Sequence, residues 1–213
     1  MSTQKTSSDS YVVPALHSGE IHRTELTVKK SRFITSTARC TGVDACKEFI
    51  SRITAEFSDA RHNCFAYNGG KPNSSGFAGC SDDGEPHGTA GQPMLNVLLH
   101  CGTGEICCVV TRYFGGILLG TGGLVKAYQD SIKLNLDSLK VQTKIDMVSF
   151  EVELEHSLGG IFNKLCTECA AVIGDTDYGA TLNVKLDVPK YKEEYFLGRL
   201  KSLCSGAPKV RRI

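Results

Sequence analysis

The sequence has no long apolar run and no excess of charge of either sign. Its formal net charge is +1 over 213 residues, so any contact with nucleic acid would need a local basic patch rather than bulk attraction. No apolar stretch approaches the roughly 20 residues that span a bilayer. The start, MSTQKTSSDS, lacks the apolar core of a secretory signal. These absences predict a cytoplasmic protein without a membrane partner.

Complete catalytic and nucleotide-binding motifs are also missing. The glycine-rich segment after residue 114 lacks the GK[ST] ending of a P-loop and the spacing of a dinucleotide fingerprint. There is no G-x-S-x-G elbow and no H-E-x-x-H helix. The ten cysteines are expected to be free thiols, because a chain without a secretory signal is expected in a reducing compartment. The short pair Cys166 and Cys169 has no second pair or histidine cluster to complete a zinc site. We therefore expect no catalytic residue, no metal ligand and no cofactor.

The pattern along the chain predicts an α+β protein with two domains. Residues 1–18 indicate a disordered tail, residues 19–141 a first domain and residues 142–213 a second. The expected elements of the first domain are paired strands at 21–40, a helix at 43–57 capped by Asp44, a strand at 62–70, turns through 71–88, a helix at 89–102, a strand at 105–114 and a helix at 122–139.

After a polar joint at 140–144 the periodicity of the apolar residues changes. Residues 145–213 give alternating strand patterns and helical patterns in the order β-α-β-β-α-β, with the last strand at 207–213. That order is typical of a ferredoxin-like domain.

The segment VVTRYFGGILLGTGGLVKAY, residues 109–128, is the first candidate site. A glycine loop between a buried strand and a helix start presents N–H groups at the positive end of a helix dipole, where an anion is stabilised. Arg112 and Lys126 could add charge-assisted contacts. The candidate anion- or nucleic-acid-binding residues are Arg112, Tyr113, Gly115, Gly116, Gly120, Gly122, Gly123 and Lys126. Alternatively, the glycines only permit positive φ angles and close packing.

An acidic turn, CSDDGEPHGTAG, is the second candidate. Its carboxylates Asp82, Asp83 and Glu85 could hold Mg²⁺ or perform acid–base chemistry. They could also simply build the turn, or one could accept Arg112 in an ion pair that fixes the loop.

A histidine on the 62–70 strand is a third candidate. His62 shares a strand face with Cys64, so they could form a thiol–imidazole pair or lie in the core, while Arg61 is expected on the opposite face.

Four stretches of the chain together resemble the IMPACT family, and most closely its bacterial, YigZ-like branch. They are KKSRFI (29–34), ARHNCFAY (60–67), SDDGEPHGTAGQPML (81–95) and the 109–128 segment. The resemblance implies a first domain like domain 2 of ribosomal protein S5 and a ferredoxin-like second domain similar to one in elongation factor G. It supplies no catalytic residue.

What the resemblance implies about function is a translation-related regulatory role. Eukaryotic relatives regulate translation by binding an activator of an initiation-factor kinase, and the fold suggests RNA or the ribosome as the bacterial partner. The favoured interpretation is therefore an RNA- or ribosome-binding protein rather than an enzyme. Two alternatives stay open: a metal- or phosphate-dependent hydrolase or phosphotransferase that uses the acidic turn and the glycine loop, and a module that binds a protein partner.

Overall fold

The computed structural model describes residues 10–204 and 208–213. The chain divides into an N-terminal unit, residues 11–144, and a C-terminal unit that contains residues 145–213. Among the described residues, no helix combines the length and the apolar character needed to cross a membrane.

The N-terminal unit is built on a five-stranded sheet. Its strands are β2 (His22–Val28), β3 (Ser31–Arg39), β4 (His62–Asn68), β5 (Ala78–Ser81) and β6 (Ile106–Tyr113). Their order is β2-β3-β6-β4-β5, and every neighbouring pair is antiparallel. The central strand β6 is buried on both faces along nearly its whole length, which explains why its sequence is continuously apolar rather than alternating.

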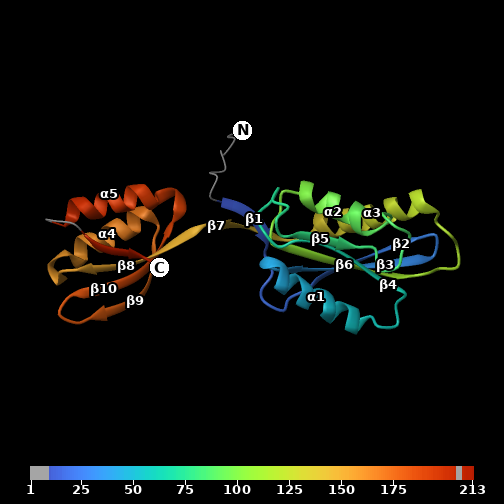
Figure 1. Ribbon diagram of the computed structural model, residues 1–213, viewed down its shortest axis with the longest axis horizontal. Coiled ribbons are helices and arrows are strands. Elements are labelled where there is room, and N and C mark those ends of the chain that lie inside the picture. Colours follow the sequence, from blue (N-terminus) through green and yellow to red (C-terminus); the bar gives the residue numbers. More distant parts are fainter. Residues whose placement is uncertain (1–9, 205–207) are drawn as a thin grey trace. The chain divides into compact units, whose positions relative to one another are not determined.

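Three helices cover the two faces of this sheet (Figure 1). They are α1 (Gly42–Glu56), α2 (Gly91–His100) and α3 (Thr121–Ser138). Helices α2 and α3 pack on one face, where Met94 and Tyr128 join the core around Phe33. Helix α1 covers the other face through Phe49 and Ile53. The helical periodicity of all three segments is confirmed by these buried stripes.

Two local predictions for this unit were wrong. Thr41, not Asp44, is the N-cap residue of α1, and Asp44 lies in the first helical turn. The segment 71–88 was predicted as turns throughout, but its residues Ala78–Ser81 form strand β5 beside β4. A strand of four residues at a sheet edge is too short for a clear alternating pattern.

A small sheet of β1 (Ser10–Pro14) and β7 (Val141–Ile145) forms where a tail and a polar joint were predicted. The prediction of a disordered tail was therefore wrong for residues 10–14, and residues 1–9 lie outside the described residues. Buried Glu105 accounts for the order here, because it accepts hydrogen bonds from Tyr11, Arg39 and Lys144. Such a multiply paired carboxylate ties three distant segments together.

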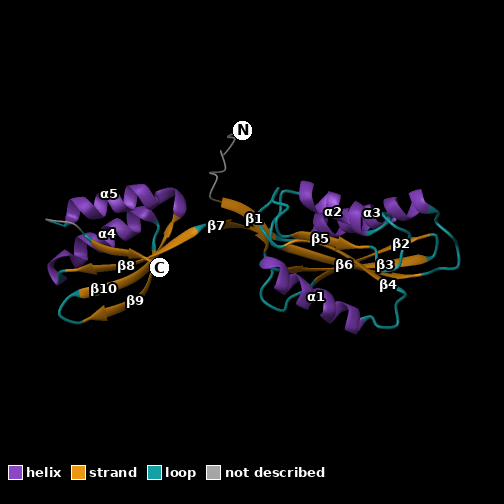
Figure 2. Ribbon diagram, viewed as in Figure 1, coloured by secondary structure: helices purple, strands orange, loops and turns teal. Residues whose placement is uncertain are grey.

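The C-terminal unit has the predicted order β-α-β-β-α-β (Figure 2). Its elements are β8 (Met147–Leu154), α4 (Gly159–Cys169), β9 (Val172–Tyr178), β10 (Leu182–Pro189), α5 (Glu193–Leu203) and β11 (Lys209–Arg212), with short 3-10 turns before α4 (His156–Leu158) and α5 (Lys190–Lys192). The sheet order is β11-β8-β10-β9, with antiparallel neighbours. Both helices pack on the sheet through one core.

Candidate functional site

A pocket of about 460 Å³ lies between the acidic turn and the glycine loop of the N-terminal unit. Its polar lining consists of Arg61, His62, Glu85, Arg112 and Thr121, and its apolar lining includes Pro86, Phe114, Leu118, Leu119 and Leu124. The two segments meet because β4 and β6 are neighbours in the sheet: His62 at the start of β4 lies directly opposite Arg112 near the end of β6. Directly opposed residues project their side chains to the same face of the sheet.

Arg112 is the buried cation of the pocket and is 7% exposed. Its Nη1 donates to Glu85 Oε1 over 2.6 Å. Its guanidinium lies over the ring of Phe33, the residue opposite it on β3, and over the ring of Phe114. Its Nε is buried and has no hydrogen-bond partner. An orphaned buried N–H is rare and unfavourable, and Arg112 is one of the residues that line the pocket.

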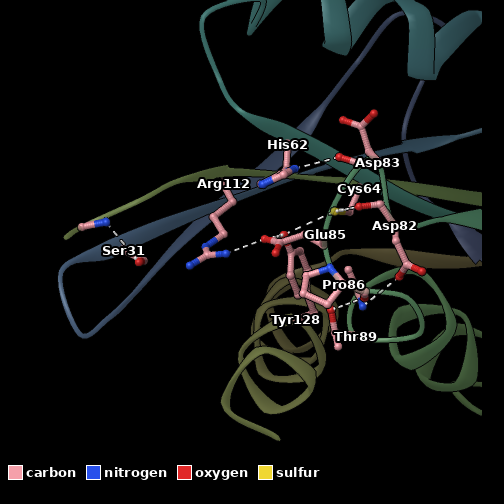
Figure 3. A network of polar contacts seen from close by, with 12 residues as sticks. Ser31, His62, Cys64, Asp82, Asp83, Glu85, Pro86, Thr89, Arg112 and Tyr128 are labelled. Atoms are coloured by element: carbon pink, nitrogen blue, oxygen red, sulfur yellow. Dashed lines mark hydrogen bonds and ion pairs between the residues drawn. The ribbon is translucent and has the colours of Figure 1, made fainter. Parts of the chain in front are cut away.

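Behind Arg112, a chain of hydrogen bonds links Glu85 to the core (Figure 3). Glu85 Oε1 also accepts a hydrogen bond from the Tyr128 hydroxyl, whose oxygen lies 3.3 Å from Cys64 Sγ. Burial raises the pKa of Tyr128 far above its usual value and raises the pKa of Cys64 to about 12. The Cys64 thiol is therefore un-ionised at neutral pH and cannot act as a nucleophile.

His62 is not paired with Cys64. Its Nδ1 lies 2.7 Å from the carbonyl oxygen of Asp83, whereas Cys64 Sγ donates to the carbonyl oxygen of Asp82. The two residues share a strand face as the spacing predicts, but each bonds separately to the acidic turn. The geometry thus gives no support to the thiol–imidazole alternative.

The three carboxylates of the acidic turn point to three different partners. Asp82 accepts hydrogen bonds from the N–H groups of Gly88, Ala90 and Gly91 at the start of α2. Asp83 accepts one from the N–H of Asn63, and Glu85 is paired with Arg112. They do not converge on a common point: among the described residues, only a group of three cysteines places its ligand atoms close enough for one metal ion. The turn therefore holds the pocket in shape.

Asp82 gives this structural role a pH dependence. Partial burial would raise its pKa, but the three N–H donors outweigh that effect and hold the pKa below its usual value. A carboxylate with a lowered folded pKa stabilises the protein above the ordinary carboxyl pKa, and the effect is lost as the pH falls through the folded value. Asp82→Asn should therefore lower the free energy of unfolding by about 1 kcal/mol at neutral pH.

Urea unfolding of the wild type and Asp82→Asn across the acid range checks this prediction. The difference between them should shrink as the pH falls below the usual carboxyl range. A difference that stays constant with pH would show that the charge of Asp82 does not act on α2.

The glycines of the loop have separate structural tasks. Gly115 donates its N–H to the Ser31 hydroxyl and packs directly on the backbone of the β2–β3 turn at Lys30. Gly116 and Gly120 have φ angles of 83° and 74°, which only glycine adopts readily. Gly120 is the N-cap of α3 and provides no side-chain cap.

The start of α3 is the open part of the loop. Thr121 and Gly122 are exposed, and a side-chain atom added at Gly122 would meet nothing within 4 Å, whereas one at Gly123 would press on Leu119. The first N–H groups of a helix have no intrahelical acceptor, and no side chain caps this helix. Gly120 and Thr121 line the pocket, so the start of α3 lies at its edge.

Of the candidate anion-binding residues, Arg112 and Gly120 line the pocket, and the others lie outside its lining: Tyr113, Gly115, Gly116, Gly122, Gly123 and Lys126. Tyr113 donates its hydroxyl to Asp59 and lies under the guanidinium of Arg32. Lys126 is exposed on α3. Conversely, Arg61 was expected to point away from His62, but both line the pocket. Arg61 precedes the first residue of β4, so the alternation of a strand does not apply to it.

Comparisons with known proteins give a consistent assignment. Residues 29–136 match the family model of the Impact N-terminal domain. The chain is 45% identical over 181 residues to IMPACT family member YigZ of Escherichia coli (strain K12), covering 84% of this chain and 88% of that protein. It is 34% identical to IMPACT family member YvyE of Bacillus subtilis (strain 168), covering 88% and 85%. A crystal structure of a hypothetical protein, 40% identical, superposes with a TM-score of 0.70 over 96% of this chain and 98% of that one.

Proposed function

The chain belongs to the IMPACT family, and from this premise we propose that it binds RNA through the pocket at the start of α3 and has a translation-related role at the ribosome. One observation carries the proposal: the buried Nε of Arg112 has no partner, and Arg112 lines a pocket that also includes the uncapped start of α3 at Gly120 and Thr121. Guanidinium and helix N–H groups both donate to phosphate oxygens. A phosphate group is the ligand that satisfies both.

The apolar wall of the pocket supports a nucleotide rather than a free phosphate ion. Phe114 is 49% exposed and Leu118 is 82% exposed, and both line the same pocket as Arg112. An exposed aromatic ring is a stacking surface for an unpaired base. A nucleotide with its phosphate at the start of α3 and its base against Phe114 would contact both the polar and the apolar wall of the pocket. Single-stranded RNA presents these groups together.

The charge around the pocket fits a small number of phosphate contacts. Glu85 neutralises much of Arg112, which leaves Arg61 in the lining and exposed Lys126 on α3 as further cations. Arg211 and Arg212, at the other end of the chain, are paired with Glu151 and Glu193. Because each phosphate contact releases counterions, few contacts imply a shallow dependence of affinity on salt.

The two folds support the same role. We propose that the N-terminal unit is like domain 2 of ribosomal protein S5 and that the C-terminal unit is ferredoxin-like, as in elongation factor G. The order β11-β8-β10-β9 supports the second assignment. Fold likeness alone does not establish function, so the proposal rests on the pocket. A role at the ribosome also implies a cytoplasmic location.

The arrangement favours binding over the enzymatic alternative. A hydrolase or phosphotransferase that used the acidic turn would need a carboxylate free to bind a metal or take a proton. Asp82, Asp83 and Glu85 instead hold backbone N–H groups and Arg112. Exposed Ile117 and Leu118 also suit the protein-interaction alternative, and capture from lysate with and without nuclease separates the two, because a protein partner survives nuclease.

Gly122→Asp is the sharpest test of RNA binding. The position is open to a side chain, and an acidic residue in the first turn stabilises a helix. The variant should therefore fold at least as stably as the wild type, yet repel phosphate from the start of α3. We expect its affinity for 5′-phosphorylated single-stranded RNA, measured by fluorescence anisotropy at low salt, to fall roughly tenfold.

Gly122→Asn is the matched control, because it has the same shape, keeps the backbone N–H and adds no charge. Its affinity should fall much less than that of Gly122→Asp. Equal affinities for the two variants would contradict the proposed site, whereas no binding of RNA by the wild type would contradict the function itself.

A further inference from the structure

Three cysteines from separate segments meet on the face of the N-terminal sheet opposite the pocket. Cys40 follows β3, Cys46 lies on α1 and Cys107 lies on β6. Their Sγ atoms all lie within 4.8 Å of one another, and all three residues are buried. They belong to the core that α1 covers, whereas the candidate phosphate pocket adjoins the core under α2 and α3. This group is therefore separate from the RNA site.

The spacing of the three sulfur atoms suits a metal ion. Thiolates bind such ions at about 2.3 Å, so three sulfurs around one ion lie about 4 Å from one another. Because the Sγ atoms lie within 4.8 Å of one another, the group meets this requirement with adjustments of less than about 1 Å, which side-chain rotation can supply. Buried cysteines commonly act as small apolar residues, but packing alone does not require three sulfurs to face one point.

Two positive groups lie near Cys40. Cys40 lies immediately before Thr41, the N-cap of α1, where the helix dipole stabilises negative charge. Arg52 lies with Cys40 in the lining of a cavity beside α1, and its guanidinium lies over the ring of Phe49.

An entry path is also present. A cavity of about 200 Å³ is lined by Cys40 together with Arg39, Glu48 and Arg52. Of the three cysteines, Cys40 alone lines it. An ion could thus reach Cys40 first and pass inward to Cys46 and Cys107.

We propose that Cys40, Cys46 and Cys107 form a three-coordinate site for a thiophilic d¹⁰ cation, with Cu⁺ as the preferred ion. Thiolates are soft ligands that suit Cu⁺. Zn²⁺ also binds thiolates, but it strongly prefers a fourth ligand, which this group does not supply. Within the described part of the chain, no histidine, carboxylate or further cysteine joins the group. Binding exchanges thiol protons for the ion, so protons are released to solvent and no electron is transferred.

The test is an anaerobic titration of the reduced, full-length protein with Cu⁺ against a chromogenic Cu⁺ chelator. We expect one ion per chain and a thiolate-to-metal charge-transfer band in the near ultraviolet. A parallel titration with Zn²⁺ against a zinc indicator should show binding at least roughly tenfold weaker than that of Cu⁺. Tighter binding of Zn²⁺ than of Cu⁺ would overturn the three-coordinate assignment.

Adjacent residues of β6 supply a matched control. Cys107 and Cys108 are both fully buried, but they belong to cores on opposite faces of the sheet. Cys107→Ala should weaken Cu⁺ binding at least roughly tenfold, whereas Cys108→Ala should retain one tightly bound ion. Equal binding by the two variants would overturn the site.

Circular dichroism without metal establishes that each variant is folded. If Cys107→Ala does not fold, Cys40→Ala tests the same site from its cavity side, with Cys101→Ala, a half-buried cysteine outside the group, as its control. Cu⁺ binding that survives in Cys40→Ala would contradict the proposal, and its selective loss would support it.

Discussion

Arg112→Ala is expected to lower the free energy of unfolding by about 3–5 kcal/mol, the range for removing one partner of a buried ion pair. Glu85 would keep a buried carboxylate whose remaining donor is the Tyr128 hydroxyl. The guanidinium also contacts the rings of Phe33 and Phe114, so packing would be lost as well. Urea unfolding followed by circular dichroism measures the effect.

A double variant separates the contribution of the Arg112–Glu85 ion pair to stability from the contribution of packing on the two rings. Arg112→Met with Glu85→Gln keeps much of the volume, removes both charges and leaves an oxygen to accept the Tyr128 hydroxyl. It should recover part of the loss, with a coupling of about 0.5–3 kcal/mol between the two positions. Lys126→Ala, at an exposed position on α3, should stay within about 0.5 kcal/mol of the wild type. A loss of that small size in Arg112→Ala would contradict the buried pair.

This stability effect governs how the RNA site can be tested. A loss of RNA binding in Arg112→Ala would not distinguish a missing phosphate contact from a rearranged loop. Substitutions at Gly122 avoid the difficulty, because that position is open and on the helix surface.

Gly115→Ala is expected to lower the free energy of unfolding by about 3 kcal/mol. A Cβ atom at Gly115 would overlap the backbone of Lys30 and Ser31, and backbone cannot rotate away as the end of a side chain can. The shift would also disturb the hydrogen bond from Gly115 N to Ser31 Oγ. Thermal or urea unfolding of the purified variant measures the loss.

Gly122→Ala is the matched control in the same loop and helix start. It has room for a methyl group, and alanine is favoured over glycine in a helix, so the variant should gain about 0.5 kcal/mol. If both alanine variants behaved alike, Gly115 would not be the residue that packs the loop on the β2–β3 turn. The opposite signs would show that the glycines have different roles: Gly115 supports packing, and Gly122 leaves the helix start open.

The sequence predicted the elements whose signal is local. The β2–β3 hairpin, the buried strand β6 and helix α3 all have patterns that a short window contains. The order of the C-terminal unit followed in the same way. Strands β1, β5 and β7 were missed because they have four or five residues each, and β1 and β7 pair with each other across most of the N-terminal unit.

The same distinction between local and long-range contacts separates the parts of the candidate site that the sequence predicted from those that it did not. An ion pair between Arg112 and the acidic turn was one of the interpretations of the sequence, and Glu85 is the partner. The role of Asp82 at the start of α2 could not be distinguished from metal binding, because it depends on where three N–H groups lie. The orphaned Nε of Arg112 and the three-cysteine group depend on packing between distant segments, which no local pattern contains.

The most direct test of the central claim is a ¹⁵N amide NMR titration of the intact protein with a short single-stranded RNA that carries a 5′-phosphate. The amides of Thr121 and Gly122 and the side-chain Nε–H of Arg112 should shift together and saturably, and much less with the same RNA lacking the phosphate. If RNA binds while these three signals stay in place, the start of α3 is not the phosphate site and the account is wrong.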